Sequence, residues 1–153
     1  MKLVASSIGV ALVLIYVVGS GLWVNTGDGW YRGLNQPSWQ PPDFIFGIIW
    51  PYNFIVLGFA AVIVSNRLSS ALVATYLSVF AISVACALTW AYQFYRPHNL
   101  EAASTALTCV AVLTIALVVI ASRASWPLVL ALMPYQIWVS IASFLSWSYA
   151  RLN

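Results

Sequence analysis

The sequence predicts an all-α integral membrane protein, a five-transmembrane-helix bundle with a long first loop. Of its 153 residues, 63% are hydrophobic and only 6% are charged, whereas a soluble domain carries about a quarter charged residues. Five apolar runs are long enough to cross the roughly 30 Å hydrocarbon core as helices. None of them alternates apolar and polar residues as the strands of a membrane barrel do. We therefore expect residues 1–153 to form a single membrane domain.

The expected spans are joined by four connections, of which three are short. The first run is longer than the apolar region of a signal peptide and no clean cleavage site follows it, so we expect it to be retained as a helix. Pro97 ends the third span in a short polar loop, because proline cannot continue a helix. We expect a multi-pass protein, in the cell membrane if it is prokaryotic, with spans at about residues 3–24, 44–64, 71–92, 102–121 and 126–149.

The first connection, at about residues 25–43, is the only long one. Its centre reads WYRGLNQPSWQPPDF, from Trp30 to Phe44, and combines three prolines with two tryptophans. Proline restricts its own backbone and that of the preceding residue, so no helix is expected through 37–42. A long ordered loop is usually functional, although Trp and Tyr also gather in loops at the membrane interface. We expect a semi-rigid cover.

The charged residues exclude several classes of function. None falls in the middle of a span, which argues against ion pathways, proton relays and voltage sensors. The basic residues form no patch, so no nucleic-acid binding is expected. The single histidine, His98, has no partners at metal-ligand spacing, so no metal site is expected, although a lone axial haem ligand stays open. With five spans, the two sides of the membrane carry equal basic charge. Lys2, Arg67 and Arg123 lie on one side, and Arg32, Arg96 and Arg151 lie on the other.

Aromatic and mildly polar side chains share a face on three of the expected helices. Aromatic walls, small residues and a few polar groups are what a pocket for a flat apolar ligand needs. Ordinary helix packing is the alternative, but Trp50 and Trp138 lie rather deep in their spans for residues of an interfacial belt. The three faces comprise Gly47, Trp50, Phe54 and Gly58; Cys86, Thr89 and Gln93; and Trp138, Ala142, Leu145 and Tyr149.

Two sequence patterns match a known family. The loop and the second span fit the pattern WYxxLxxPxWxPP…W through Trp30, Tyr31, Leu34, Pro37, Trp39, Pro41, Pro42 and Trp50, and the last span contributes Pro134, Tyr135, Trp138, Ala142 and Trp147. On these residues the chain resembles the TspO/MBR family of tryptophan-rich sensory or translocator proteins over nearly its whole length. The resemblance implies a five-helix bundle, commonly a homodimer, with a ligand pocket beneath the first loop and no bound cofactor.

The resemblance also implies the ligands and the pocket residues. Family ligands include protoporphyrin and other tetrapyrroles such as haem, sterols in eukaryotic members, and benzodiazepine- and isoquinoline-type drugs. Some members promote light-dependent porphyrin breakdown through the tryptophans that correspond to Trp50 and Trp138. A receptor or sensor is therefore expected, with a porphyrin-degrading enzyme or a facilitative transporter as alternatives. By position, the ligand-binding residues are Tyr31, Pro41, Trp50, Phe54, Gln93, Trp138 and Ala142, to which the shared helix face adds Cys86 and Thr89.

Two positions depart from the family pattern. Cys86 stands where members often have asparagine, and Ala106 where some have aspartate. Both changes remove a polar anchor, so the family's ligand preference is not carried over. The segment Leu145–Tyr149–Arg151 fits the loose L-x₃-Y-x-R cholesterol pattern, but we do not expect a dedicated sterol site there.

Overall fold

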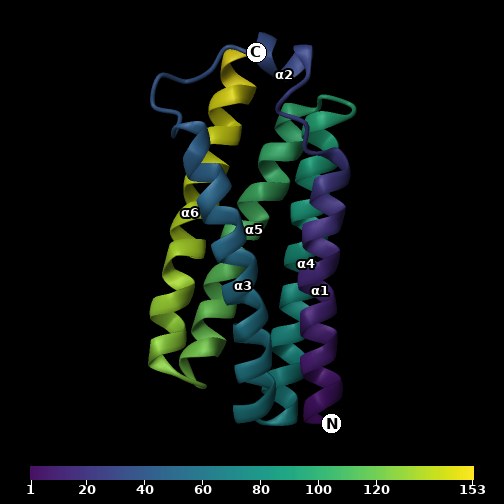
Figure 1. The fold of residues 1–153 in the computed structure, drawn as a ribbon, viewed down its shortest axis with the longest axis vertical. Coiled ribbons are helices and arrows are strands. Elements are labelled where there is room, and N and C mark those ends of the chain that lie inside the picture. Colours follow the sequence, from purple (N-terminus) through teal and green to yellow (C-terminus); the bar gives the residue numbers. More distant parts are fainter.

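The computed structural model describes all 153 residues and contains helices but no strand (Figure 1). Five helices are long and apolar enough to cross a membrane, which confirms the predicted fold class. They run antiparallel to their chain neighbours, and the one remaining helix, α2, is short. The helices are α1 (Lys2–Trp23), α2 (Gly29–Gly33), α3 (Asp43–Arg67), α4 (Ser70–Tyr95), α5 (Leu100–Ser122) and α6 (Trp126–Leu152).

The long helices do not pack evenly along their length. In Figure 1, α1 and α3 lie together near the N-terminus and separate towards the end that carries α2. Gly9 permits the close approach, because a Cβ at this position would collide with the Cβ of Ala61. Small residues at such crossings let membrane helices pack backbone to backbone. The bundle is therefore tight at one end and leaves room between its helices at the other.

The buried apolar residues form two clusters. The larger runs through the middle of the bundle and includes Tyr16, Tyr76 and Tyr135. The smaller lies at the end that carries α2 and contains Phe94, Tyr95, Ala103, Leu145 and Tyr149. Tyr52 adds a polar link between α3 and α6, since its hydroxyl donates to the carbonyl of Ala131 over 2.9 Å.

The first loop contains one element that the sequence analysis did not predict, the short helix α2. Asp28 precedes this helix, and its carboxylate accepts a hydrogen bond from the backbone N–H of Tyr31 over 2.8 Å. Aspartate is favoured at this position because it satisfies a free donor of the first turn. Residues 37–42 are not helical, as predicted; the backbone N–H of Gln40 donates to the carbonyl of Pro37 over 3.0 Å and closes a turn.

Basic side chains are held by carbonyl oxygens at both ends of the bundle. At the N-terminal end, Lys2 Nζ donates to the carbonyl of Asn66 over 2.9 Å and Arg67 to that of Ala124 over 3.3 Å. At the other end Arg96 donates to the carbonyl of Leu22 over 3.5 Å. These contacts place Lys2 and Arg67 at one end of the bundle and Arg96 at the other, as the sequence predicted.

Candidate ligand cavity

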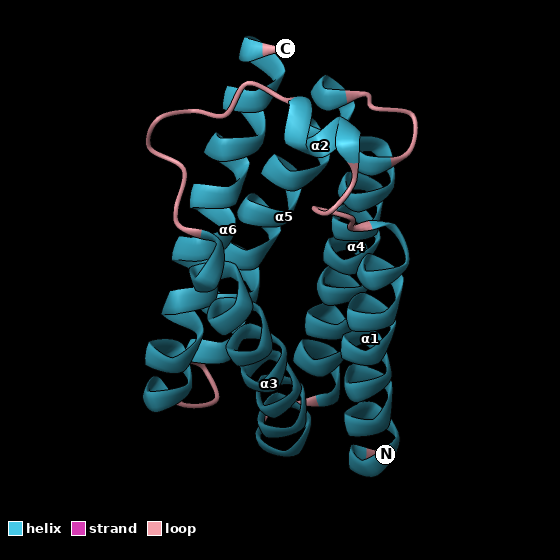
Figure 2. Cartoon of the chain, turned by 45° about the horizontal axis from the view of Figure 1, so that its top comes forward, coloured by secondary structure: helices cyan, strands magenta, loops and turns pink.

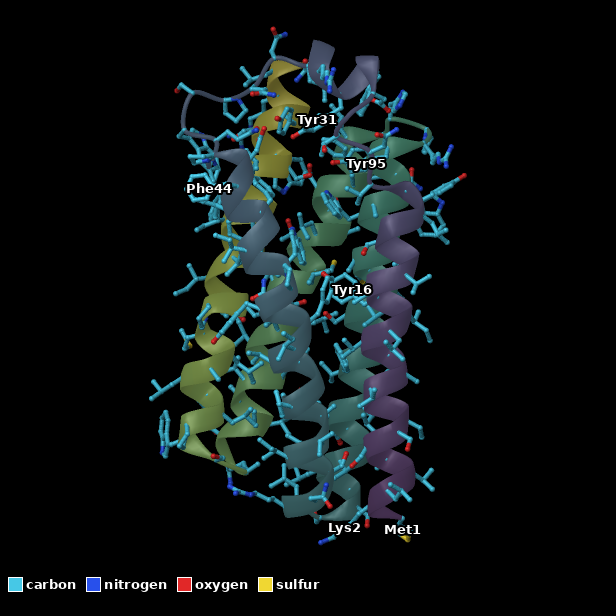
Figure 3. All side chains as sticks on the ribbon, in the orientation of Figure 1. Met1, Lys2, Tyr16, Tyr31, Phe44 and Tyr95 are labelled. Atoms are coloured by element: carbon cyan, nitrogen blue, oxygen red, sulfur yellow. The ribbon has the colours of Figure 1, made fainter.

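A cavity of about 640 Å³ lies at the end of the bundle that carries α2. Its size is within the range of small-molecule sites, about 300–1,000 Å³. Of the 22 residues that line it, 14 are hydrophobic, and they come from every helix except α5. In Figure 3, Tyr31 and Tyr95 lie at the loop end, whereas Tyr16 lies deeper between the helices. The cavity therefore occupies the space left where α1 and α3 separate.

The walls of the cavity are aromatic side chains that hold one another. Trp50 stacks on Phe54, with ring centroids 5.7 Å apart and planes at 27°. Tyr16 meets the edges of both rings, at 6.1 Å from Trp50 and 5.1 Å from Phe54. Across the cavity, Phe46 meets Trp138 edge to face at 5.0 Å. Such edge and offset contacts are the favoured geometries of aromatic pairs, so the walls are fixed before any ligand enters.

Trp50 and Trp138 are perpendicular to each other. Their ring centroids lie 6.5 Å apart and their planes make an angle of 90°. A flat ligand can therefore lie face-on against only one of these two rings and meets the other at its edge. The two tryptophans that the resemblance assigns to ligand binding therefore do not form a parallel pair around one flat ligand.

The cover of the cavity is built by α2 and the loop that follows it. The ring of Tyr31 packs on those of Tyr95 and Tyr149, with centroids 5.9 and 6.1 Å apart. The hydroxyl of Tyr149 donates to the side-chain oxygen of Gln40 and lies 3.4 Å from the hydroxyl of Tyr31, from which its oxygen can accept a hydrogen bond. One hydroxyl on α6 thus holds both parts of the cover, the helix α2 and the turn before Pro41.

The loop is also fastened to the end of α6. The backbone N–H of Asn35 donates to Asn153 Oδ1 over 2.8 Å, and its side chain donates to the carbonyl of Leu152 over 3.2 Å. Asn153 Nδ2 donates in return to the carbonyl of Asn35 over 3.2 Å. Figure 2 shows the loop passing the C-terminus before it descends to α3. The cover is therefore attached to the last helix at several points.

Buried polar groups without partners border the cavity. The indole N–H groups of Trp90 and Trp138 are buried and make no hydrogen bond, and the same is true of the Tyr16 hydroxyl. Leaving a buried donor unpaired costs about 1–3 kcal/mol. A ligand with acceptor atoms would remove part of this cost. Arg32 and Asp43 are the charged residues of the lining.

The structure brings together five of the nine ligand-binding residues expected from the sequence. These five line the cavity: Tyr31, Trp50, Phe54, Trp138 and Ala142. Leu145 and Tyr149, which the sequence places on the same face as Trp138, also line it. The sequence analysis expected the aromatic and mildly polar faces of three helices to form one pocket. Trp50 and Phe54 of the α3 face do meet the α6 face at the cavity, whereas the expected face of α4 does not.

The other four residues do not line the cavity: Pro41, Cys86, Thr89 and Gln93. Pro41 lies in the cover next to Gln40. On α4 the cavity is faced by Trp90 and Phe94 instead, which are one turn apart. Cys86 lies one turn below Trp90 and packs against the larger core cluster. Thr89 is exposed, and its hydroxyl donates to the carbonyl of Ala85 over 2.8 Å.

Five aromatic residues of the lining were not predicted, namely Tyr16, Phe46, Trp90, Phe94 and Tyr95. The spacing of Trp90 and Phe94 was a usable signal, because residues four apart share a helix face. Phe46 carried the same signal, since Trp50 follows it four residues later, whereas Tyr16 offered less because it is a single aromatic residue within its part of an apolar run.

Two other sequence features lie away from the cavity. Ala106 is on α5, which contributes nothing to the lining, so the absence of a carboxylate there leaves the cavity wall unchanged. His98 is outside the cavity as well, where its ring stacks on Trp30 with centroids 3.7 Å apart. In the L-x₃-Y-x-R segment, Leu145 and Tyr149 are buried at the cavity while Arg151 is exposed, so the three residues do not form one surface.

The fold and the site define a class of protein: a bundle of five membrane-spanning helices, four of which surround an aromatic cavity that a tethered loop closes. The profile of the TspO/MBR family matches residues 7–152. Protein CrtK of Rhodobacter capsulatus is 30% identical over 125 residues, which cover 81% of this chain and 78% of that protein. Tryptophan-rich protein TspO of Chlorobaculum tepidum is 29% identical over 150 residues, 97% and 94% of the two chains. The human translocator protein is 26% identical over 141 residues, 89% and 82%.

The chain belongs to the TspO/MBR family and is an integral, multi-pass membrane protein. The match covers all five long helices and the loop that closes the cavity.

Proposed function

We propose that this protein is a membrane receptor or sensor that binds a porphyrin-type tetrapyrrole, such as protoporphyrin or haem, in the cavity beneath the first loop. The observation that supports this proposal is the cavity of about 640 Å³, whose aromatic walls include two buried and unpaired indole N–H groups.

The chemistry of the walls suits a flat macrocycle with acidic substituents. The face of Trp50 supplies stacking, and the edge of Trp138, whose plane is perpendicular to it, supplies apolar contact. The unpaired N–H groups of Trp90 and Trp138 are buried in the wall and would reach an acceptor atom of the ligand if their rings turn. Arg32 on α2 lines the same space, and a guanidinium pairs well with a carboxylate. The ligand would thus be stacked within the helices and paired at the cover.

Light-dependent degradation of the porphyrin is the second candidate function. It is favoured by the position of Trp50 and Trp138, two oxidisable indoles that both line the cavity within 6.5 Å of each other. A facilitative transporter has no comparable observation in its favour.

Titration of the purified protein with protoporphyrin, first in darkness and then under light, tests the proposal and separates the two candidates. Saturable binding in both conditions without new absorbing products supports a receptor. Products that form only in the presence of both light and protein support the degrading enzyme. Absence of saturation at micromolar ligand contradicts both.

A further inference from the structure

A second hollow lies on the outer side of α6, at the same end of the bundle as the first loop. It is a groove of about 630 Å³ and shares no lining residue with the ligand cavity. Because α6 spans the membrane, the outer side of its last turns faces lipid. The groove is lined by Trp39, Ile141, Phe144, Trp147, Ser148 and Arg151.

The polarity of the groove residues increases along the helix axis. Ile141, Phe144, Ser148 and Arg151 follow one another at intervals of three or four residues, so they form a single stripe on α6. From Ile141 to Arg151 the stripe is about 15 Å long. That length is half of the roughly 30 Å hydrocarbon core, one leaflet of the bilayer. The deep end of the stripe is apolar, and its outer end carries a hydroxyl and a guanidinium.

The cation at the outer end lacks a partner within the groove. Arg151 is exposed, and no acidic side chain lines the groove. A guanidinium pairs with two oxygens of a phosphate at once. Ser148 lies one turn deeper and adds a second donor on the same stripe. The charge and the donors of this end are therefore complementary to an anionic headgroup.

Two tryptophans border the groove, and both are held in place. The indole N–H of Trp147 donates to Thr108 Oγ1 over 3.0 Å, which fixes its ring against α5. Trp39 is 48% exposed and comes from the first loop, which the pair Asn35 and Asn153 fastens to the end of α6. Tryptophan is favoured at the level of the lipid headgroups. The groove therefore has an apolar floor, aromatic sides and a cationic end.

We propose that this groove binds one anionic phospholipid. An acyl chain lies along Ile141 and Phe144, the phosphate pairs with Arg151 and Ser148, and the glycerol part contacts Trp39. Because Trp39 belongs to the cover of the ligand cavity, a bound lipid also holds the cover against α6.

Lipid binding to the full-length protein tests this proposal. The protein is purified in neutral detergent and titrated by native mass spectrometry with phosphatidylglycerol or phosphatidylcholine of identical acyl chains. We expect tighter binding of phosphatidylglycerol. Arg151→Gln should weaken it about fivefold, the equivalent of about 1 kcal/mol for one arginine near the membrane surface, and should weaken phosphatidylcholine less, because the choline cation already neutralises its phosphate. Arg151→Lys should keep most of the preference.

Arg123→Gln is the matched control, since Arg123 is also exposed but lies at the opposite end of the bundle. It should leave the binding of both lipids unchanged. If Arg151→Gln and Arg123→Gln lose affinity for phosphatidylglycerol equally, the protein attracts anionic lipid through its overall charge, and the proposal is overturned. Equal affinity of the parent protein for the two lipids, displacement of phosphatidylglycerol by glycerol phosphate, or preferential binding of a sterol to the groove would overturn it as well.

Discussion

The hydroxyl of Tyr149 on α6 joins the two halves of the loop that covers the cavity, because it contacts the hydroxyl of Tyr31 on α2 and donates to Gln40 in the turn that follows. The same hydroxyl borders the cavity. A ligand beneath the loop would therefore leave more readily when these hydrogen bonds are removed.

Tyr149→Phe removes both hydrogen bonds and keeps the ring contacts with Tyr31 and Phe94. A neutral hydrogen bond contributes about 1 kcal/mol, so we expect protoporphyrin to dissociate roughly 5- to 10-fold faster. Stopped-flow dissociation measures this rate. Tyr52→Phe is the control, since its hydroxyl binds Ala131 outside the cover. Equal dissociation rates in the parent and in Tyr149→Phe would show that these bonds do not hold the cover closed.

Pro41 and Pro42 restrict the backbone where the cover joins α3. Replacing both with glycine increases the conformational freedom of the loop, so we expect weaker binding of protoporphyrin at a nearly unchanged melting temperature. Pro97→Gly, in the exposed loop before α5, serves as the control. If the double variant binds as tightly as the parent, the cover does not gate the cavity.

Trp50 and Trp138 are expected to contribute to binding of one and the same ligand. Truncation to alanine should cost about 1–3 kcal/mol at the ring that stacks on the ligand, by analogy with base stacking, or roughly 5- to 150-fold in affinity, and less at the ring that meets the ligand edge-on. Because the rings touch a shared ligand, the two losses should not add. Phenylalanine should keep most of the binding and abolish any light-dependent breakdown, since it lacks the oxidisable indole.

A double-mutant cycle on protoporphyrin affinity, with melting temperatures measured in parallel, checks this prediction. Trp126→Ala is the control, because Trp126 is 70% exposed at the far end of α6. If the losses of affinity are additive and parallel the decreases in melting temperature, Trp50 and Trp138 are packing residues instead.

Asn53 on α3 is fully buried, and neither atom of its side-chain amide makes a hydrogen bond. Asn53→Leu keeps a similar volume and removes two unpaired polar groups. We expect this variant to be more stable by about 1–3 kcal/mol, which would raise its melting temperature in detergent. A lower melting temperature would show that internal water satisfies the amide.

The sequence predicted the five spans and the ends at which each basic residue lies, because the thickness of the bilayer and the cost of burying charge dictate both. It did not predict α2, which is five residues long and depends on a single cap by Asp28. The orientation of α4 was also missed, so Cys86, Thr89 and Gln93 were expected at the cavity in place of Trp90 and Phe94. In lipid, both the buried and the outer faces of a helix are apolar, so periodicity does not show which face points inward.

Filling the cavity tests the central claim most directly. Ala142 lines the cavity on α6 between Trp138 and Tyr149, whereas Ala106 on α5 does not line it. Ala142→Trp and Ala106→Trp are compared with the parent by protoporphyrin titration in darkness, and their helical content and melting temperature are measured by circular dichroism. We predict one saturable site per chain in the parent and in Ala106→Trp, and none in a folded Ala142→Trp. Unchanged binding by Ala142→Trp would contradict the assignment of this cavity as the porphyrin site.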